Sequence, residues 1–513
     1  MVNKVNTATV IGLNPYIVEV EVDTVRSIPN ISIVGLPDTA INEARDRVRS
    51  AIRNSGFTFP DGKVVVNLAP ADLKKEGSHF DLPISIGILV EEDVISSEAI
   101  KDYAFIGELS LDGSLRPVAG VLPLVLGLKD FGINNVIVPQ ENVQEAALAQ
   151  GITVFGAKSL CDVVSHFVES PLEPTAIDVE KYLKNSIEQE YTYDFKDVKG
   201  QQKAKKALEI AAAGNHNLLM TGSPGSGKTL MAKCFPSILP PLTIQEALEL
   251  TKIYSISGLL SSKEPLMTRR PFRAVHHTAS PNGIIGGGTV PKPGEITLAH
   301  RGVLFLDEMA EFPRAVLEVL RQPLEDSEIV ISRAKHSIKY PAKFLLLGAM
   351  NPCPCGFLGD KEKQCTCSEF QVNRYLSRLS GPLLDRIDLQ IEVPRLSSDE
   401  LLNYKVTEES SEQIRSRVVK ARNIQYNRYK NEGILTNSEL TPKLIKKYCK
   451  IDDETNKIFK VAIVKYQLSG RRYDRVLKLA RTIADLDNSQ NIEQKHLMQA
   501  LQYKMIDFDK LKQ

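Results

Sequence analysis

Three stretches of the chain place side chains that handle phosphate and metal ions beside apolar runs. The first, Gly222-Ser223-Pro224-Gly225-Ser226-Gly227-Lys228-Thr229, follows the apolar run 217–221 and opens a helical pattern. Glycines let backbone N–H groups converge on phosphate oxygens, Lys228 reaches the β- and γ-phosphates, and Thr229 offers a hydroxyl to Mg²⁺. A chance glycine-rich turn is the alternative. The complete motif between a strand and a helix predicts a site for a nucleoside triphosphate with Mg²⁺.

Two later strand ends carry matching groups. Asp307 and Glu308 follow the apolar run 303–306, and a solvated helix start is the alternative for such a pair. An Asp at this position of a phosphate-loop enzyme holds Mg²⁺, and the Glu after it is suited to act as the general base on the attacking water. Asn351 follows the run 343–349 after Met350 and would orient that water; the alternative is a plain turn residue before Pro352.

Four of the seven cysteines form a separate cluster, in which two C-x-C pairs are separated by nine residues. Four thiolates in one local loop can close a tetrahedral Zn²⁺ site, although C-x-C is a less usual zinc spacing than C-x-x-C. Buried free thiols or a redox pair are the alternatives. We expect Cys161, Cys234 and Cys449 to be core residues. The members of the cluster are Cys353, Cys355, Cys365 and Cys367.

Composition limits the classes of protein to which these sites can belong. The chain has 513 residues, 42% of them apolar and 25% charged, which is typical of a soluble globular protein. Neither a membrane-spanning run nor a signal peptide is recognisable, and the odd cysteine count favours a reducing cytoplasm. The formal charge of +1 excludes nucleic-acid binding by bulk positive charge, so such binding needs a local basic surface.

The elements that must position these groups fall into an α/β chain of several domains. Residues 1–168 mix β-rich runs with helical stretches such as 39–55, which predicts an α+β domain, and residues 169–194 are a polar linker with one short helix. Residues 195–395 alternate helical and buried-strand patterns, which predicts a helix-covered parallel sheet carrying the cysteine-rich insertion 353–367. Residues 396–513 are predicted to be helical.

A candidate surface for nucleic acid lies just before the third strand. Residues 328–340 have the pattern of two strands that meet at a basic turn, where Arg333 and Lys335 would contact phosphates without reading bases. An exposed hairpin with ordinary surface charges is the alternative. The basic helix around 415–430 is interpreted as a solvated face. The neighbouring His276 and His277 cannot share one helix face as a metal pair and are interpreted as structural or as loop contacts.

The order of these motifs, continued by Ser380-Gly381-Pro382-Leu383-Leu384-Asp385-Arg386-Ile387-Asp388, resembles the magnesium-chelatase-like AAA+ ATPases of the YifB/ComM group over essentially the whole chain. The resemblance implies a P-loop AAA+ core with a C-terminal helical lid, and ATP with Mg²⁺ as cofactors. It gives Asn351 the sensor-1 role, Arg386 the arginine-finger role toward a neighbouring subunit, and Arg471 the sensor-2 role. The family usually has Ala where Gly470 stands. A surface charge is the alternative for each arginine.

Residues 1–168 also resemble the ribosomal-S5-type fold that the Lon protease domain shares, through segments 107–113 and 136–142. Lon uses a Ser–Lys dyad. Here Ser78 is offset from the nucleophile position, and aliphatic residues of 121–124 stand where the lysine would fall, so we expect no peptidase activity.

The resemblance implies a cytoplasmic homo-oligomeric ring, as a hexamer, that couples ATP hydrolysis to movement on single-stranded or branched DNA. Its activity would be branch migration or helicase activity in recombination or natural transformation. The alternative is a magnesium-chelatase-type remodelling ATPase that acts on a protein partner during metal insertion into a porphyrin. That reaction needs separate integrin-like and catalytic subunits, which this chain does not contain.

Overall fold

The computed structural model describes residues 3–186, 191–288, 292–332, 337–360, 362–396, 408–466 and 468–503. The chain forms two compact units. The first contains Met1–Glu188, Thr243–Thr268 and Ser332–Lys339, and the second contains Gln189–Leu242, Arg269–Ile331 and Tyr340–Gln513. Thr243–Thr268, which the sequence places inside the ATPase core, thus groups with the N-terminal part. The boundaries at 168, 194 and 395 stay predictions.

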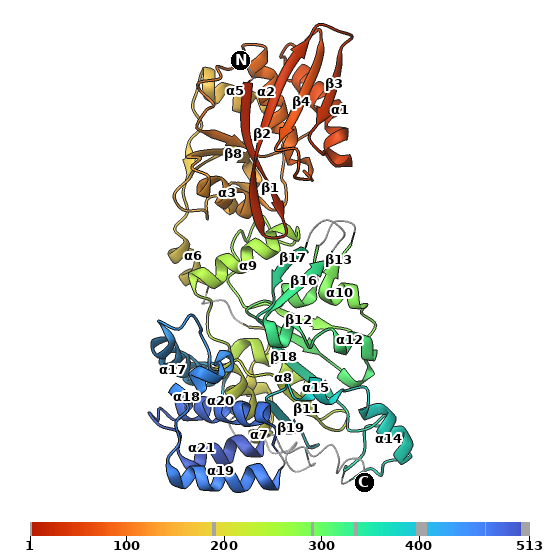
Figure 1. Cartoon of the computed structure of the whole chain (residues 1–513), viewed down its shortest axis with the longest axis vertical. Coiled ribbons are helices and arrows are strands. Elements are labelled where there is room, and N and C mark those ends of the chain that lie inside the picture. Colours follow the sequence, from red (N-terminus) through yellow and green to blue (C-terminus); the bar gives the residue numbers. More distant parts are fainter. Residues whose placement is uncertain are drawn as a thin grey trace. The chain divides into compact units, whose positions relative to one another are not determined.

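The first unit is built on an eight-stranded mixed sheet of order β10-β9-β8-β5-β1-β2-β4-β3. Its two long strands, β1 (Asn3–Ile11) and β2 (Asn14–Val25), pair antiparallel and lie side by side in Figure 1. The shorter strands are β3 (Asn30–Val34), β4 (Lys63–Ala69), β5 (Tyr103–Phe105), β8 (Asn135–Pro139), β9 (Thr153–Ala157) and β10 (Pro174–Thr175), with a separate pair β6 (Glu108–Leu109) and β7 (Leu115–Arg116).

The core of the first unit lies between this sheet and its helices. Helix α2 (Asp81–Glu91) packs on β1 and β2, and its residues from Asp81 to Val90 are all buried. Asp38 caps α1 by accepting from the backbone N–H of Ile41, which places the start of the predicted helix at Thr39. The other helices are α1 (Thr39–Asn54), α3 (Val121–Asp130), α4 (Val143–Ala146), α5 (Leu160–Val168), α6 (Val179–Ser186) and α9 (Ile244–Ile256).

Helix α3 opens with the aliphatic segment that stands where a Lon-type lysine would fall. The side chains of this segment are buried, and the N–H of Leu122 donates to the carboxylate of Glu145 at 2.9 Å. The same carboxylate accepts from Ser255 Oγ of α9. Glu145 therefore satisfies an otherwise free N–H at the start of α3 and joins that helix to α9.

The second unit is built on a five-stranded parallel sheet of order β12-β15-β18-β11-β19. Its strands are β11 (Leu218–Thr221), β12 (Phe272–Val275), β15 (Val303–Leu306), β18 (Leu345–Met350) and β19 (Leu389–Glu392). The three buried runs of the sequence become β11, β15 and β18, and every residue of these strands is buried. Such continuous apolar runs are typical of parallel strands covered on both faces. A two-stranded sheet of the second unit pairs β13 (Gly286–Gly287) with β14 (Lys292–Pro293). Strands β16 (Glu328–Ser332) and β17 (Ser337–Pro341) form another two-stranded sheet, of which residues 332–339 are assigned to the first unit.

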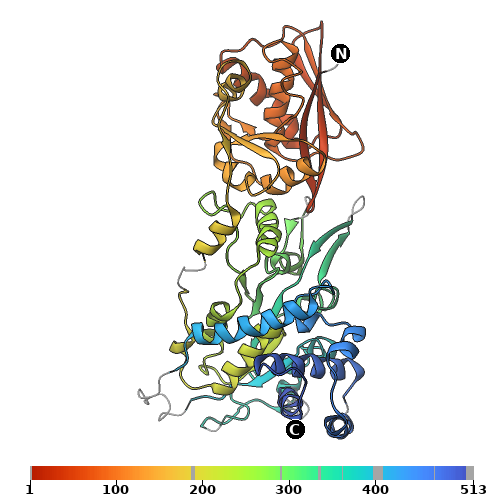
Figure 2. The same ribbon diagram turned by 90° about the vertical axis from the view of Figure 1, so that its left-hand side faces the viewer.

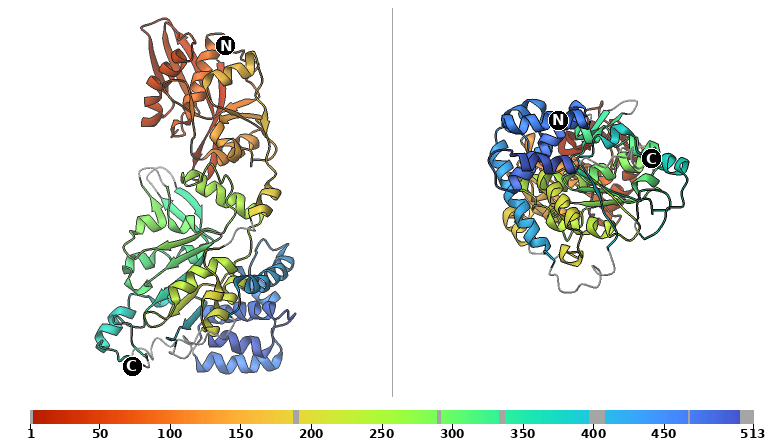
Figure 3. Two further views of the ribbon diagram at one scale, coloured as in Figure 1. Left: turned by 180° about the vertical axis from the view of Figure 1, so that it is seen from behind. Right: turned by 90° about the horizontal axis from the view of Figure 1, so that it is seen from below.

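The helices of the second unit include a C-terminal group, α17–α21, that gathers on one side of the sheet (Figure 3). The long helix α17 lies beside α7 in Figure 2, and Arg422 of α17 donates to the carbonyls of Ala212 and Ala213 at the end of α7. These bonds satisfy carbonyls that a helix end leaves free. The helices are α7 (Gln202–Gly214), α8 (Lys228–Cys234), α10 (Pro281–Ile285), α11 (Glu295–Leu298), α12 (Arg314–Glu318), α13 (Pro323–Asp326), α14 (Glu369–Leu376), α15 (Gly381–Leu384), α17 (Ser411–Tyr429), α18 (Pro442–Tyr448), α19 (Asp453–Lys465), α20 (Gly470–Leu486) and α21 (Gln494–Gln502).

Candidate nucleotide site and cysteine cluster

The three predicted phosphate- and metal-handling segments meet at one edge of the parallel sheet. Strand β18 lies between β11 and β15, and the register pairs Thr221 with Met350 and Leu306 with Gly348. Because parallel strands end at the same edge, the phosphate loop, the Asp-Glu pair and Asn351 emerge side by side. Ligands of open α/β sheets bind at this carboxyl edge.

Glycine is required in the phosphate loop by close backbone approach and by backbone angle. A Cβ atom on Gly222 would lie 2.1 Å from the carbonyl oxygen of Val393. Gly225 and Gly227 have φ values of +79° and +93°, which are strained for residues with a side chain. Helix α8 begins directly after this loop, at Lys228.

Lys228 is bound within the phosphate loop and is only 8% exposed. Its Nζ donates to the carbonyls of Gly222 and Ser223 at 2.7 and 2.9 Å, and lies 3.4 Å from Oδ1 of Asn351. Burial lowers the pKa of Lys228 to about 8, while the Asp307 charge opposes that shift. An anionic group beside this ammonium would favour its charged form.

Thr229 and Asp307 are brought together as a magnesium site requires. Thr229 Oγ1 donates to Asp307 Oδ2 at 2.9 Å. The backbone N–H of Glu308 donates to the other Asp307 oxygen at 3.0 Å. Hydroxyl and carboxylate oxygens are hard ligands of the kind Mg²⁺ prefers, so the pair fits the predicted metal role.

Glu308 has an unusual backbone and a neighbour that the sequence did not reveal. Its φ is +50°, in the left-handed region that few non-glycine residues occupy, and such strain clusters at functional sites. Its carboxylate is 55% exposed, and Oε2 lies 3.5 Å from Nδ1 of His277. His277 comes two positions after β12, the strand paired with β15. Only the strand order, and no local pattern, could have indicated this contact.

The two predicted ATP-facing arginines converge on one carboxylate outside the phosphate loop. Arg386 pairs with Glu325 of α13 and is only 7% exposed, and Arg471 at the start of α20 lies 3.4 Å from the same carboxylate. Arg386, ahead of burial and the other charges, holds the pKa of Glu325 below its usual range. The next arginine, Arg472, donates to Asp385 at 2.8 Å. The structure thus joins Arg386 with Arg471 and gives Arg472 a separate partner.

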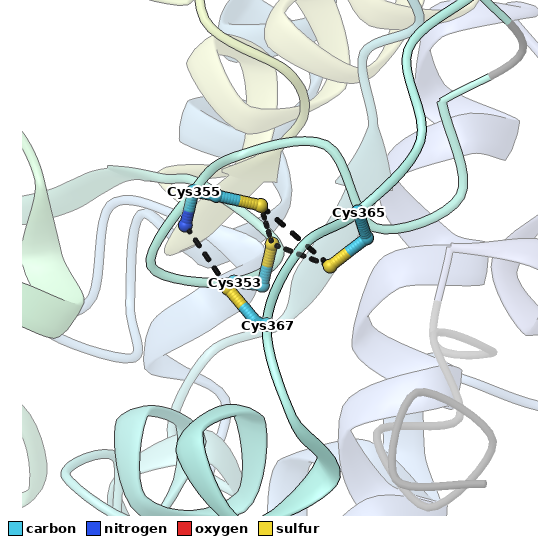
Figure 4. A group of neighbouring side chains, drawn as sticks. All are labelled: Cys353, Cys355, Cys365 and Cys367. Carbon is cyan, nitrogen blue, oxygen red and sulfur yellow. Dashed lines mark hydrogen bonds between the residues drawn. The ribbon is translucent and has the colours of Figure 1, made fainter.

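The four clustered cysteines lie together on the loop between β18 and α14 (Figure 4). Their sulfur atoms are all within 4.8 Å of one another, an arrangement compatible with a zinc site. Burial raises the pKa of Cys353 to about 12. The pKa of Cys355 is lowered to about 6: burial opposes this shift, but the backbone N–H groups of Phe357 and Thr366 outweigh it.

Three other sequence interpretations have different outcomes. Cys161, predicted to be a core residue, is exposed, whereas Cys234 and Cys449 are buried. The interpretation of 415–430 as a solvated face is wrong in part, because Arg417 and Arg428 of α17 pair with Glu209 of α7 and Asp485 of α20. A basic residue that anchors one helix to another gives the same sequence pattern as a solvated one. Arg333 and Lys335 lie outside the described residues.

Comparisons with known proteins cover nearly all of the chain. The family described as "Magnesium chelatase, subunit ChlI" matches residues 194–401, with "Subunit ChlI of Mg-chelatase" at 20–142 and "Magnesium chelatase, subunit ChlI C-terminal" at 408–504. Competence protein ComM of Haemophilus influenzae is 44% identical over 495 residues, which are 96% of this chain and 95% of that protein. The chain belongs to the YifB/ComM family of magnesium-chelatase-like proteins.

Two further relatives show how sequence identity and coverage vary within this wider group. The YifB protein of Escherichia coli is 41% identical over 508 residues, covering 98% of this chain and 97% of that one. A magnesium-chelatase subunit ChlI homologue of Methanocaldococcus jannaschii is 25% identical over 255 residues, 46% of this chain and 68% of its own. Membership in the YifB/ComM family implies an ATPase that uses ATP and Mg²⁺. No helix in the described part of this family member is long and apolar enough to cross a membrane.

Proposed function

We propose that this chain is a ring-forming ATPase, a homo-hexamer, that couples ATP hydrolysis to movement on DNA. The proposed activity is branch migration or helicase activity in recombination or natural transformation. The observation that carries the proposal is the near-complete nucleotide site in a chain 44% identical, over 96% of its length, to a protein named for competence.

The nucleotide chemistry follows from the groups at the sheet edge. Bound Mg²⁺ would neutralise charge that develops on the phosphoryl oxygens. Thr229 and Asp307 are the residues that would hold this ion, and Lys228 would bind the phosphates, which take the place of its present carbonyl partners. Glu308 is the proposed base that takes a proton from the attacking water, and Asn351, beside Lys228, orients that water.

Arg386 is proposed to complete the site of a neighbouring copy. A guanidinium supplied from another subunit stabilises the transferred phosphoryl group in many P-loop enzymes, and that contribution reaches several kcal/mol. To act in this way, Arg386 must exchange Glu325 for phosphate. Arg471 shares Glu325 with it, so we propose that both arginines face the same neighbouring nucleotide.

DNA contact is assigned to the basic turn that the sequence predicts at residues 328–340, through Arg333 and Lys335, which lie outside the described residues. In a ring, several copies of this turn would create a basic lining although each chain carries a formal charge of only +1. Such a lining contacts phosphates, so the protein would bind DNA with little base preference.

A second candidate function is remodelling of a protein partner by a chelatase-type ATPase. The ChlI family matches along the chain favour it. The two functions share the nucleotide site and differ in what stimulates hydrolysis.

The test compares ATP hydrolysis by the full chain with no DNA, single-stranded DNA and branched DNA. We expect DNA to raise kcat, and we expect Arg333→Ala with Lys335→Ala to abolish the increase while the basal rate stays unchanged. The matched control is Lys420→Ala with Lys430→Ala, which removes the same charge from exposed positions of α17 and its C-terminal cap. If DNA neither stimulates hydrolysis nor binds, the proposal of movement on DNA fails, and the result favours the chelatase-type function.

A further inference from the structure

The sulfur atoms of Cys353, Cys355 and Cys365 have nearly the separations of a tetrahedral metal site, and all four sulfurs of the cluster, that of Cys367 included, lie within 4.8 Å of one another. The distances are 3.4 Å between Cys353 and Cys355, 3.7 Å between Cys353 and Cys365, and 3.6 Å between Cys355 and Cys365. Zn–S bonds of about 2.3 Å in a tetrahedron place sulfurs about 3.8 Å apart. Figure 4 shows the sulfurs of Cys353, Cys355 and Cys365 grouped, while the sulfur of Cys367 accepts from the backbone N–H of Cys355.

The loop that carries these thiols has little secondary structure of its own. Within the described residues of 353–367 there is no helix or strand. Its first regular element is α14, which begins after the Ser368 cap. A metal ion bound to both C-x-C pairs would cross-link the two ends of the loop, and such binding energy stabilises small segments that lack a core.

This loop is also seated on the phosphate loop. Ser223 Oγ donates to Asp360 Oδ2 at 2.6 Å. A Cβ on Gly356 would lie 2.6 Å from the ring of Pro224, so the backbone of Gly356 packs closely against that ring. Asn351, two positions before Cys353, lies 3.4 Å from Lys228 Nζ. Three contacts therefore join the cysteine loop to the segment that would hold the phosphates.

We propose that the four cysteines bind one Zn²⁺ and that this ion holds the phosphate loop in the conformation that binds ATP. Binding replaces the thiol protons by the metal, so the protons are released to solvent. Without the ion, the loop loses its cross-link, and Asp360 and Gly356 no longer hold Ser223 and Pro224 in place. Because coupling between two sites is reciprocal, ATP should strengthen zinc binding by the same factor. The inference rests on the proposed function only in that the phosphate loop binds ATP.

The first measurement is the metal content of the purified full chain by mass spectrometry, for which we expect one zinc per chain. Zinc is then removed with a chelator, and the affinity for a fluorescent ATP analogue is measured before removal, after it and after Zn²⁺ is returned. We expect affinity to fall about 10-fold, within the range of known couplings, and to recover with Zn²⁺. Cys161→Ser, a change at an exposed cysteine outside the cluster, should leave zinc content and affinity unchanged.

Asp360→Ala separates the coupling from the metal site, because it removes the contact with Ser223 and leaves all four thiols. We expect this variant to retain zinc and to bind the ATP analogue more weakly, with a smaller change when zinc is removed. A chain without zinc whose four thiols react freely would overturn the metal site. Equal affinities with and without zinc would overturn the coupling. If the zinc-loaded chain binds no ATP analogue at all, the phosphate-loop assignment fails instead.

Discussion

At the predicted base, residues of two segments, one after β15 and one after β12, surround the carboxylate of Glu308. The strained backbone of Glu308 projects the side chain from the end of β15, and its N–H is held by Asp307. The His277 ring lies 3.5 Å from the carboxylate and packs edge-on against Phe312. A half-exposed carboxylate can adopt many orientations. The neighbouring His277 ring reduces the number that the Glu308 side chain can adopt.

Glu308→Gln should leave ATP bound and hydrolysis slow. The amide has nearly the same shape but cannot accept the proton of water, and general bases contribute about 10²–10⁴-fold. Single-turnover hydrolysis and binding of a fluorescent ATP analogue measure the two effects separately. Unimpaired turnover by this variant would show that another group is the base.

His277→Ala should lower kcat by on the order of 10-fold without changing KM for ATP, since poor orientation of a catalytic group slows chemistry more than binding. His277→Asn, which can place an amide nitrogen near the position of Nδ1, should restore part of the rate. His276→Ala should lower kcat less, because His276 contacts Thr278 at 2.9 Å through its Nδ1 and reaches the site only by packing its ring on that of His277, at a centroid distance of 4.1 Å.

A double variant makes the His277 prediction sharper. If His277 acts through Glu308, then His277→Ala should add nothing to Glu308→Gln. Additive losses, an unchanged kcat or a raised kcat in the single variant would each reject this positioning role.

Among the elements, helix α20 connects the C-terminal helices by a buried carboxylate at its last turn. Asp485 is completely buried and accepts from Arg428 of α17, from Arg481 of its own helix and from Asn437. Two guanidinium groups around one buried carboxylate are stable only as a set. Arg471 lies in the first turn of the same helix, so the anchoring of α20 also positions this predicted sensor-2 residue.

Asp485→Ala should destabilise the helical region by ~3–5 kcal/mol, because the buried Arg481 and the partly buried Arg428 lose their counter-charge. Glu412→Ala, at an exposed position in the first turn of α17, is the control and should cost under about 1 kcal/mol. Urea unfolding followed by circular dichroism measures both. Equal, small losses would mean that the Asp485 network contributes little to stability.

For the whole molecule, the central question is whether each nucleotide site needs two copies of the chain. Arg386 and Arg471 share Glu325, while Lys228, Thr229, Asp307 and Asn351 form a separate bonded group. The role proposed for Arg386 predicts this separation, because the guanidinium would then act on the nucleotide of a neighbouring copy. A formal charge of +1 permits such association without strong mutual repulsion.

Mixing two inactive variants tests this arrangement. Lys228→Ala removes the phosphate contact, and Arg386→Ala removes the arginine, so neither should hydrolyse ATP efficiently alone. In rings mixed at equal amounts, about a quarter of the sites combine an intact phosphate loop with an intact neighbouring arginine, which should recover activity. Gel filtration confirms that mixed rings form. Assemblies that form but stay inactive at every mixing ratio would place Arg386 in its own site.

The sequence by itself determined three strands of the parallel sheet, the phosphate loop and the order of the motifs. These features depend on local patterns: buried runs of four to six residues for β11, β15 and β18, and glycines where the backbone needs positive φ or close approach. Overall similarity also places this chain in its family, because the alignment with a relative that is 44% identical covers 96% of the chain.

Only the tertiary structure decided which distant residues meet. His277 lies beside Glu308 because β12 pairs with β15, and Asp360 holds Ser223 because the cysteine loop folds back on the phosphate loop. Glu325 gathers two arginines separated by 85 positions in the chain. Local composition and spacing carry no information about such contacts, since they arise from strand order and helix packing, and both are set by burial of the whole core.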